Sequence, residues 1–150
     1  MSLSNGQISL EFLLIIALVF ALIASVSAPL AHQARLYSED IAKVSEMRIS
    51  LETIVTAADI VGATGVGARR TVRVHFPNVT ILKPELLSVS KNISFEVELS
   101  DGAKTLEKTS KYFIKGSSSF SQGLKLNDWR DIIVECKLNA TGLPIIEIRI

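Results

Sequence analysis

The amino-acid sequence predicts an α+β fold, in which a long N-terminal helix, hydrophobic at first and amphipathic later, packs on a small antiparallel β-sheet domain. Two observations support this fold class. No charged residue lies between Glu11 and Arg35, and from Thr71 onward the apolar residues change from helical spacing to alternation. Once a membrane-length segment is set aside, the 150 residues leave enough chain for one small domain.

The first element is an apolar run over residues 12–31. At about 1.5 Å per residue it forms a helix of about 30 Å, which matches the hydrocarbon core of a bilayer, so we expect this run to cross a membrane. Pro29 lies near its end and should bend or open the helix, because proline has no backbone donor. The alternative is a secretory signal cleaved after Ala28. The segment before the run, however, has no Lys or Arg and ends in Glu11, unlike an ordinary signal peptide.

Gly6, Gln7, Ser9 and Glu11 precede the apolar run in the sequence Gly-Gln-Ile-Ser-Leu-Glu. This segment resembles the class III signal peptide of archaeal type IV pilin-like proteins, the prepilin family. The resemblance implies a pilin-like fold and cleavage between Gly6 and Gln7 by a prepilin-type leader peptidase, with residues 1–6 as the leader. The leader lacks the Lys or Arg that is usual in the family, so a cytoplasmic N-terminus is expected from the resemblance alone.

The resemblance also gives Glu11 and Pro29 a role in assembly. Cleavage would make Glu11 the fifth residue and would place Pro29 near the helix-bending proline of many pilins. The new α-ammonium of Gln7 would lie one helical turn from Glu11, where it could pair with the acid of a neighbouring subunit. The implied partners are other copies of the chain in a homo-oligomeric filament, the leader peptidase, the membrane and the pilus assembly machinery.

Helical spacing continues beyond the apolar run, and we expect one long helix over residues 7–61. Its apolar stripe consists of Leu30, Ala34, Tyr37, Ile41, Val44, Met47, Leu51, Ile54, Ala58 and Val61. Gly62, Gly65 and Gly67 are expected to end the helix, with residues 62–70 as a linker. Phosphate-binding loops follow a strand and open a helix, whereas these glycines close one, so a nucleotide site is not expected.

Residues 71–150 are expected to form the antiparallel β domain, because apolar and polar side chains alternate along them. The alternating runs are 72–76, 93–99 and 146–150. Asp101-Gly102 is a strong turn signal between two strands, and residues 139–144 are expected to form the turn of the last hairpin.

Asn78, Asn92 and Asn139 each begin an Asn-X-Ser/Thr triplet and are expected N-glycosylation acceptors. They are three of the five asparagines in the chain, which agrees with an exported domain. The alternative is that these triplets arose by chance in a chain rich in Ser and Thr.

The composition argues against several classes of function. A net charge of +1 gives no general attraction for nucleic acid. One cysteine and two histidines cannot form a Cys/His metal set, so no metal or other cofactor is expected. Cys136 is interpreted as a buried apolar residue, His75 as part of a solvated strand face, and Trp129 as a core or lid residue. No convergent catalytic groups are visible, and we expect no enzyme.

The sequence therefore predicts a structural subunit of a type IV pilus-like extracellular filament or pseudopilus, anchored by its helix before assembly through helix–helix packing. Its expected location is the cell membrane, as a single-pass protein with an extracellular C-terminal domain, and then the extracellular filament. The alternative is a single-pass, membrane-anchored extracellular binding domain that does not polymerise. A secreted hydrolase behind a signal peptide is a third class, which the sequence disfavours.

Overall fold

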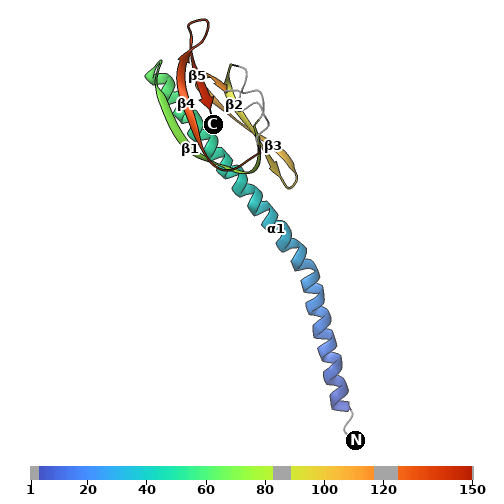
Figure 1. Cartoon of the computed structure of the whole chain (residues 1–150). Helices are drawn as coiled ribbons and strands as arrows, with labels where there is room; N and C mark the ends of the chain where they lie inside the picture. The colour runs from blue at the N-terminus through green and yellow to red at the C-terminus, as the bar shows by residue number, and fades with distance from the viewer. Residues whose placement is uncertain (1–3, 83–88, 117–124, 150) are drawn as a thin grey trace. The chain divides into compact units, whose positions relative to one another are not determined.

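In the described residues, 4–82, 89–116 and 125–149, the computed structural model has one helix followed by five strands (Figure 1). The elements are α1 (Ser4–Thr64), β1 (Arg69–Leu82), β2 (Ser90–Leu99), β3 (Gly102–Gly116), β4 (Lys125–Leu138) and β5 (Pro144–Arg149). The chain divides into two compact units, Met1–Glu39 and Asp40–Ile150. The predicted α+β class is confirmed.

The five strands form a closed barrel in the order β1-β2-β3-β5-β4, with β4 pairing back onto β1. All pairs are antiparallel except β3 and β5, where Ile114 lies opposite Ile146 in a parallel register. The prediction of a purely antiparallel sheet is therefore wrong. The sequence could not reveal the parallel pair, because side chains alternate in the same way along parallel and antiparallel strands. In addition, β3 and β5 become neighbours only when the barrel closes.

Both predicted hairpin turns are present. β2 and β3 pair from Leu99 and Gly102 onward, and β4 and β5 pair from Leu138 and Pro144 onward. Gly102 has a φ of 136° and Gly142, in the β4–β5 turn, has a φ of 77°. Residues with a Cβ rarely adopt these φ values, so glycine suits both turns.

The junction between α1 and β1 is shorter than predicted. α1 runs to Thr64, and β1 already begins at Arg69, so little of the expected linker remains. Pairing between β1 and β4 begins before the predicted start of the strand. The Cys136 amide already donates a hydrogen bond to the Ala68 carbonyl at 2.9 Å.

Gly62 lies inside α1 and does not end it, which corrects the predicted boundary. A Cβ built on Gly62 would lie 2.4 Å from Cδ2 of Tyr112, a distance that no real contact tolerates. The glycine therefore lets the tyrosine ring of β3 lie directly against the helix. Sequence alone could not assign this role, because the neighbour is distant in the chain.

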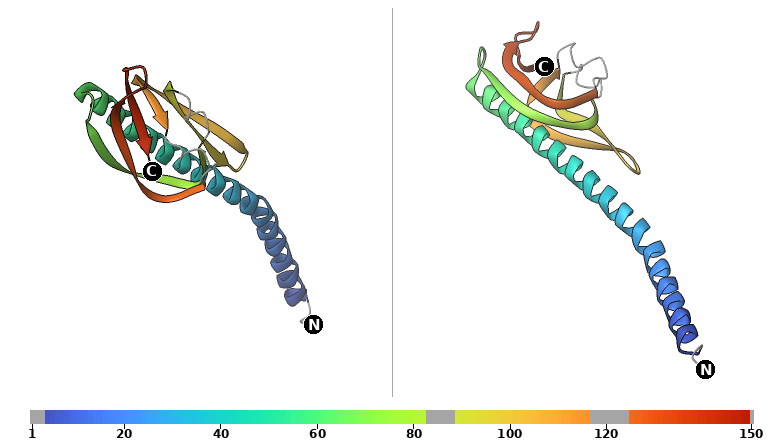
Figure 2. Two further views of the ribbon diagram at one scale, coloured as in Figure 1. Left: turned by 45° about the horizontal axis from the view of Figure 1, so that its top comes forward. Right: turned by 60° about the horizontal axis from the view of Figure 1, so that its bottom comes forward.

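The C-terminal part of α1 lies along the strands of the barrel (Figure 2), and the hydrophobic core consists of buried residues from both. Phe76 and Phe95 meet edge to face, with ring centroids 5.9 Å apart. From α1 the buried apolar residues are Met47, Leu51, Ile54, Val55, Ala57, Ala58 and Val61. From the strands they are Val74, Phe76, Ile93, Phe95, Val97, Leu106, Ile114, Ile132, Val134, Cys136, Ile146 and Ile148. Cys136 is buried as predicted, and this burial raises the pKa of its thiol.

Within the described strands, two segments pair with another strand on one side only. There, residues 69–76 of β1 pair with β4 but not with β2, and residues 102–109 of β3 pair with β2 but not with β5. α1 supplies hydrogen-bonding groups where strand neighbours are missing. The hydroxyl of Ser50 donates to the backbone carbonyl of His75 on β1. A helix that covers an open strand edge protects it from pairing with another chain.

Acidic side chains of α1 also bind β3 and the turn that precedes it. Oδ1 of Asp59 accepts hydrogen bonds from the Lys111 amide at 2.9 Å and from the Ser110 hydroxyl at 2.6 Å. Asp40 accepts from the amide of Ser100, in the β2–β3 turn, at 3.1 Å and also from its hydroxyl. The hydrogen bond from the Ser100 hydroxyl lowers the pKa of Asp40. These contacts fix the residue 40–64 part of α1 against the barrel.

Candidate functional site

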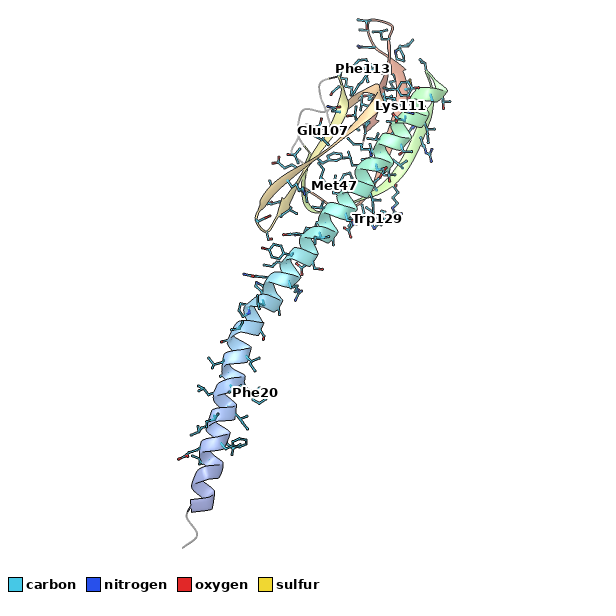
Figure 3. All side chains as sticks on the ribbon, turned by 180° about the vertical axis from the view of Figure 1, so that it is seen from behind. Phe20, Met47, Glu107, Lys111, Phe113 and Trp129 are labelled. Carbon is cyan, nitrogen blue, oxygen red and sulfur yellow. The ribbon has the colours of Figure 1, made fainter. Side chains whose placement is uncertain are left out.

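The first candidate surface is the N-terminal part of α1, residues 10–39. It belongs to a helix long and apolar enough to cross a membrane, and the most apolar stretch of that helix has no buried residue. Phe20, for example, is 67% exposed and projects from the helix, whereas Met47 is fully buried against the barrel (Figure 3). The exposed large apolar residues of this surface are Leu10, Phe12, Leu13, Leu14, Ile15, Leu18, Val19, Phe20, Leu22, Ile23, Val26, Leu30 and Tyr37.

The predicted processing residues lie at the start of this surface. Gly6, Gln7 and Ser9 belong to α1 by their backbone, but their side chains are outside the described part of the chain, as are residues 1–3. Glu11 is exposed and makes no ion pair with any described residue. Processing at the Gly6–Gln7 bond and pairing of Glu11 remain predictions.

α1 continues through Pro29 without ending. Proline has no backbone donor, so one helical hydrogen bond is lost at this position. Ser25, nearby, turns its hydroxyl back onto the Leu22 carbonyl at 2.8 Å, which satisfies this polar group within the helix.

The three predicted glycosylation residues are distributed over different strands and turns. Asn92 on β2 is exposed, and its Oδ1 accepts a hydrogen bond from the Thr109 hydroxyl at 2.9 Å. Asn139 lies in the β4–β5 turn, partly exposed, where its Oδ1 accepts from the Ala140 amide at 2.7 Å. Asn78 lies in β1, and its side chain is outside the described residues.

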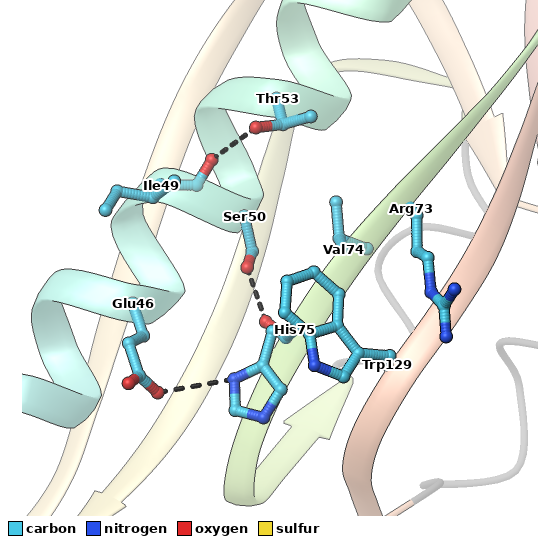
Figure 4. Close-up of a pocket in the computed structure, with 8 residues that line it drawn as sticks. All are labelled: Glu46, Ile49, Ser50, Thr53, Arg73, Val74, His75 and Trp129. Atoms are coloured by element: carbon cyan, nitrogen blue, oxygen red, sulfur yellow. Dashed lines mark hydrogen bonds and ion pairs between the residues drawn. The ribbon is translucent and has the colours of Figure 1, made fainter.

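The second candidate surface is a groove between α1 and β1, with Trp129 of β4 at its side (Figure 4). One section has a volume of about 380 Å³ and is lined by Glu46, Ile49, Ser50, Thr53, Arg73, Val74, His75 and Trp129. A second section of about 220 Å³ adjoins it through Thr53 and includes Thr56, Arg70 and Val72. All of these residues belong to the Asp40–Ile150 unit.

Strand register explains why an indole lies at this groove. Trp129 is the cross-strand partner of His75, so both side chains project from the same face of the barrel. Their ring centroids are 5.2 Å apart, and the Arg73 guanidinium lies 5.8 Å from the centroid of Trp129. Trp129 is 54% exposed, so it is not a core residue, and of the two predicted roles only that of a lid residue stays a prediction. His75 faces outward as predicted.

An ion pair spans the groove. Nδ1 of His75 lies 3.3 Å from Oε2 of Glu46, which joins β1 to α1 whenever the imidazole is protonated. Sequence reasoning missed the groove because its walls come from three separate segments. The sequence held one hint of this groove: Arg73 and His75 alternate outward on a strand, and the chain has a single tryptophan that could lie beside them.

In the described residues, no group of three or more His, Cys, Asp and Glu side chains could hold a metal ion. No family model matches the chain, and no curated protein or solved structure is significantly similar to it.

Proposed function

We propose that the chain is a structural subunit of a type IV pilus-like extracellular filament or pseudopilus, held in the membrane by α1 before it assembles through helix–helix packing. The supporting observation is the uncovered apolar surface of residues 10–39. Burying one large apolar side chain contributes roughly 1.5–3 kcal/mol, so a surface with many of them needs a cover. Lipid provides that cover before assembly, and sister helices provide it afterwards.

Glu11 gives this packing a register. It is an exposed acid at the border of the apolar surface, and no described residue neutralises it. Carrying such a carboxylate to the centre of a bilayer costs about 2.5–3.5 kcal/mol. In the proposed filament it pairs with the α-ammonium of Gln7 in a neighbouring subunit, created by cleavage after Gly6. Only the correct neighbour satisfies both charges.

The N-terminus of the native protein tests the processing step. Sequencing or intact-mass analysis should give a chain that begins at Gln7 if a prepilin-type leader peptidase acts on it. A start at Met1 would support a plain membrane anchor instead, and a start near Pro29 would identify a secreted protein and end the proposal.

Electron microscopy of purified native material tests assembly, with two matched variants. Glu11→Ala should strongly reduce filament number, because the acid that sets the register is lost. Glu39→Ala removes another exposed acid of the same helix and should leave filaments unchanged. If Glu11→Ala subunits assemble as well as wild type, the proposed pairing is wrong.

The proposed extracellular location implies N-glycosylation. Asn92 and Asn139, whose side chains are at least partly exposed, are the best-placed acceptors, and Asn78 is the third. Asn92→Gln and Asn139→Gln should each reduce the intact mass of native protein by one glycan. Detection of bare polypeptide alone would remove this part of the proposal.

The groove favours a second candidate, a membrane-anchored extracellular binding domain that does not polymerise. In this function α1 acts only as an anchor. Native protein that retains its helix, stays in membranes and forms no filaments at any protein concentration would support the second candidate over the first.

A further inference from the structure

The groove between α1 and β1 has the size of a binding site. Its larger section, about 380 Å³, falls within the range of roughly 300–1,000 Å³ that is typical of small-molecule sites. With the adjoining section it follows α1 from Glu46 to Ala57, which is about 16 Å along a helix axis. A site of this length accommodates a short linear ligand better than a single compact molecule.

The groove offers an aromatic surface to such a ligand. Trp129 is 54% exposed although it contacts both His75 and Arg73, so part of the indole remains open to solvent. An exposed indole provides a rigid apolar surface beside polar groups. The apolar faces of pyranose rings pack well on such a surface, while their hydroxyls remain available for hydrogen bonds.

The groove is lined by two arginines and by two glutamates, and the glutamates already face cationic partners of the chain: Glu46 faces His75, and Glu52 faces Lys108. Arg70 and Arg73 both line it, and neither makes an ion pair with any other residue that the structure describes. Asp131 is the cross-strand neighbour of Arg73, but their charged groups are beyond ion-pair distance. An arginine that is not engaged by a carboxylate of its own chain can bind one from a ligand with two parallel hydrogen bonds.

The backbone of the groove argues against a peptide ligand. An extended peptide usually binds by adding a strand to an open edge. On β1 the relevant edge is next to α1, and the Ser50 hydroxyl already occupies the carbonyl of His75. The remaining polar contacts are side chains, among them Glu46, which is 51% exposed and has one oxygen directed to His75. Its second oxygen can accept a hydrogen bond from a sugar hydroxyl.

We propose that this groove binds an acidic glycan, a polysaccharide that contains uronic acid units. One sugar ring packs on Trp129, and its carboxylate binds Arg73. Glu46 accepts hydrogen bonds from ring hydroxyls. This binding does not depend on filament assembly, since every participating residue lies in the Asp40–Ile150 unit.

Because Trp129 is the only tryptophan, its fluorescence reports directly on the groove. The full chain in non-ionic detergent is titrated with a tetrasaccharide of galacturonic acid and, separately, with the neutral galactose tetrasaccharide. The acidic ligand should change the emission in a saturable manner, with an affinity about tenfold or more above that of the neutral ligand, as expected for one charge-assisted contact. Tetraglutamate, of equal charge, controls for charge alone.

Variants separate the roles of the two contacts, with affinities measured by ligand-observed NMR. Arg73→Gln should remove the preference for the acidic over the neutral ligand. Trp129→Ala should weaken both ligands by about tenfold, as expected for a lost stacking surface. Lys91 and Phe113 provide a matched control, because the Lys91 ammonium lies 5.0 Å from the centroid of the Phe113 ring, which is 50% exposed on β3. Lys91→Gln and Phe113→Ala should change neither affinity.

Three results would overturn the proposal. The first is no change in Trp129 emission at millimolar concentrations of the acidic tetrasaccharide. The second is binding that survives both Arg73→Gln and Trp129→Ala in variants whose circular dichroism matches wild type. The third is equal binding of tetraglutamate, which would identify an acidic peptide, including one from a second copy of the chain, as the ligand. None of these results depends on whether filaments form.

Discussion

α1 has two regions that differ in what covers them. Over residues 10–39 nearly every large apolar side chain is exposed, whereas from Met47 to Val61 the apolar stripe is buried by the barrel. The apolar stripe predicted from the sequence runs through both regions without a visible break, yet Leu30, Tyr37 and Ile41 on it are exposed. One helical pattern therefore serves two different surroundings.

The two regions of α1 also differ in composition. The bare region is more apolar than the covered region, so its hydrophobicity cannot be explained by the fold of the chain itself. The covered region has polar residues at intervals, and these bind the barrel through Asp40, Ser50 and Asp59. The covered region is therefore held in the folded domain by specific polar contacts as well as by apolar burial.

The largest expected effect comes from truncating a buried side chain of α1, compared with the same kind of truncation in residues 10–39. Ile54→Ala should lower the free energy of unfolding of the barrel unit by about 2–5 kcal/mol, because Ile54 is 1% exposed and its removal leaves a cavity. Leu18→Ala, in the bare region, should leave that free energy unchanged. Chemical denaturation in non-ionic detergent measures both. An equal loss for the two variants would mean that residues 10–39 are also covered by this chain.

The next effect concerns close packing of α1 on the barrel. Gly62→Ala should lower the free energy of unfolding by about 1–3 kcal/mol, because its Cβ would overlap the ring of Tyr112. In a Tyr112→Ala background the same change should cost much less, since the overlapping ring is gone. A Gly62→Ala penalty that persists in this background would show that the tyrosine is not its cause.

The smallest expected effect on the free energy of unfolding concerns ion pairs. It compares a partly buried network on the barrel with an exposed pair on α1. Glu147 accepts hydrogen bonds from Arg149 at 2.6 Å and from Lys137 at 2.7 Å, and the Arg149 contact is the main reason that its pKa falls from 4.5 to about 2. A lowered carboxyl pKa stabilises the fold above about pH 4.5, and this contribution disappears as the pH falls from 4.5 to 2.

Glu147→Gln should therefore lower the free energy of unfolding at pH 7 by about 1 kcal/mol and flatten its dependence on pH between 2 and 4.5. Glu39 supplies the comparison in the bare region, where its pair with Arg35 is exposed on both sides. Glu39→Gln should change the free energy of unfolding by less than about 0.5 kcal/mol. If Glu147→Gln left the pH profile unchanged, the network would have no role in acid stability.

Much of the fold could be predicted because its signals are local. The apolar run over residues 12–31, the helical spacing that follows it and the alternation in the strands each depend on neighbours within a few positions. The Asp101-Gly102 turn is equally local, since its glycine needs a positive φ. These features were predicted correctly, apart from helix and strand boundaries near Gly62 and Arg69.

The candidate sites likewise differ in whether their signal is local. Glu11, Pro29 and the Asn-X-Ser/Thr triplets were found because each is recognised within a short segment, although their roles in processing, assembly and glycosylation stay predictions. The groove was missed, because Glu46, Arg73 and Trp129 come from three elements and meet only through strand register and helix docking.

The sequence by itself determined the elements of this protein: a helix with an apolar N-terminal half, and strands with one apolar face. Only the tertiary structure decided that β3 and β5 pair in parallel, that Gly62 accommodates Tyr112, and that the barrel buries the stripe of α1 from Met47 to Val61. The physical reason is that hydrophobic periodicity fixes which face of an element is buried, whereas the choice of partner depends on contacts between residues far apart in the chain.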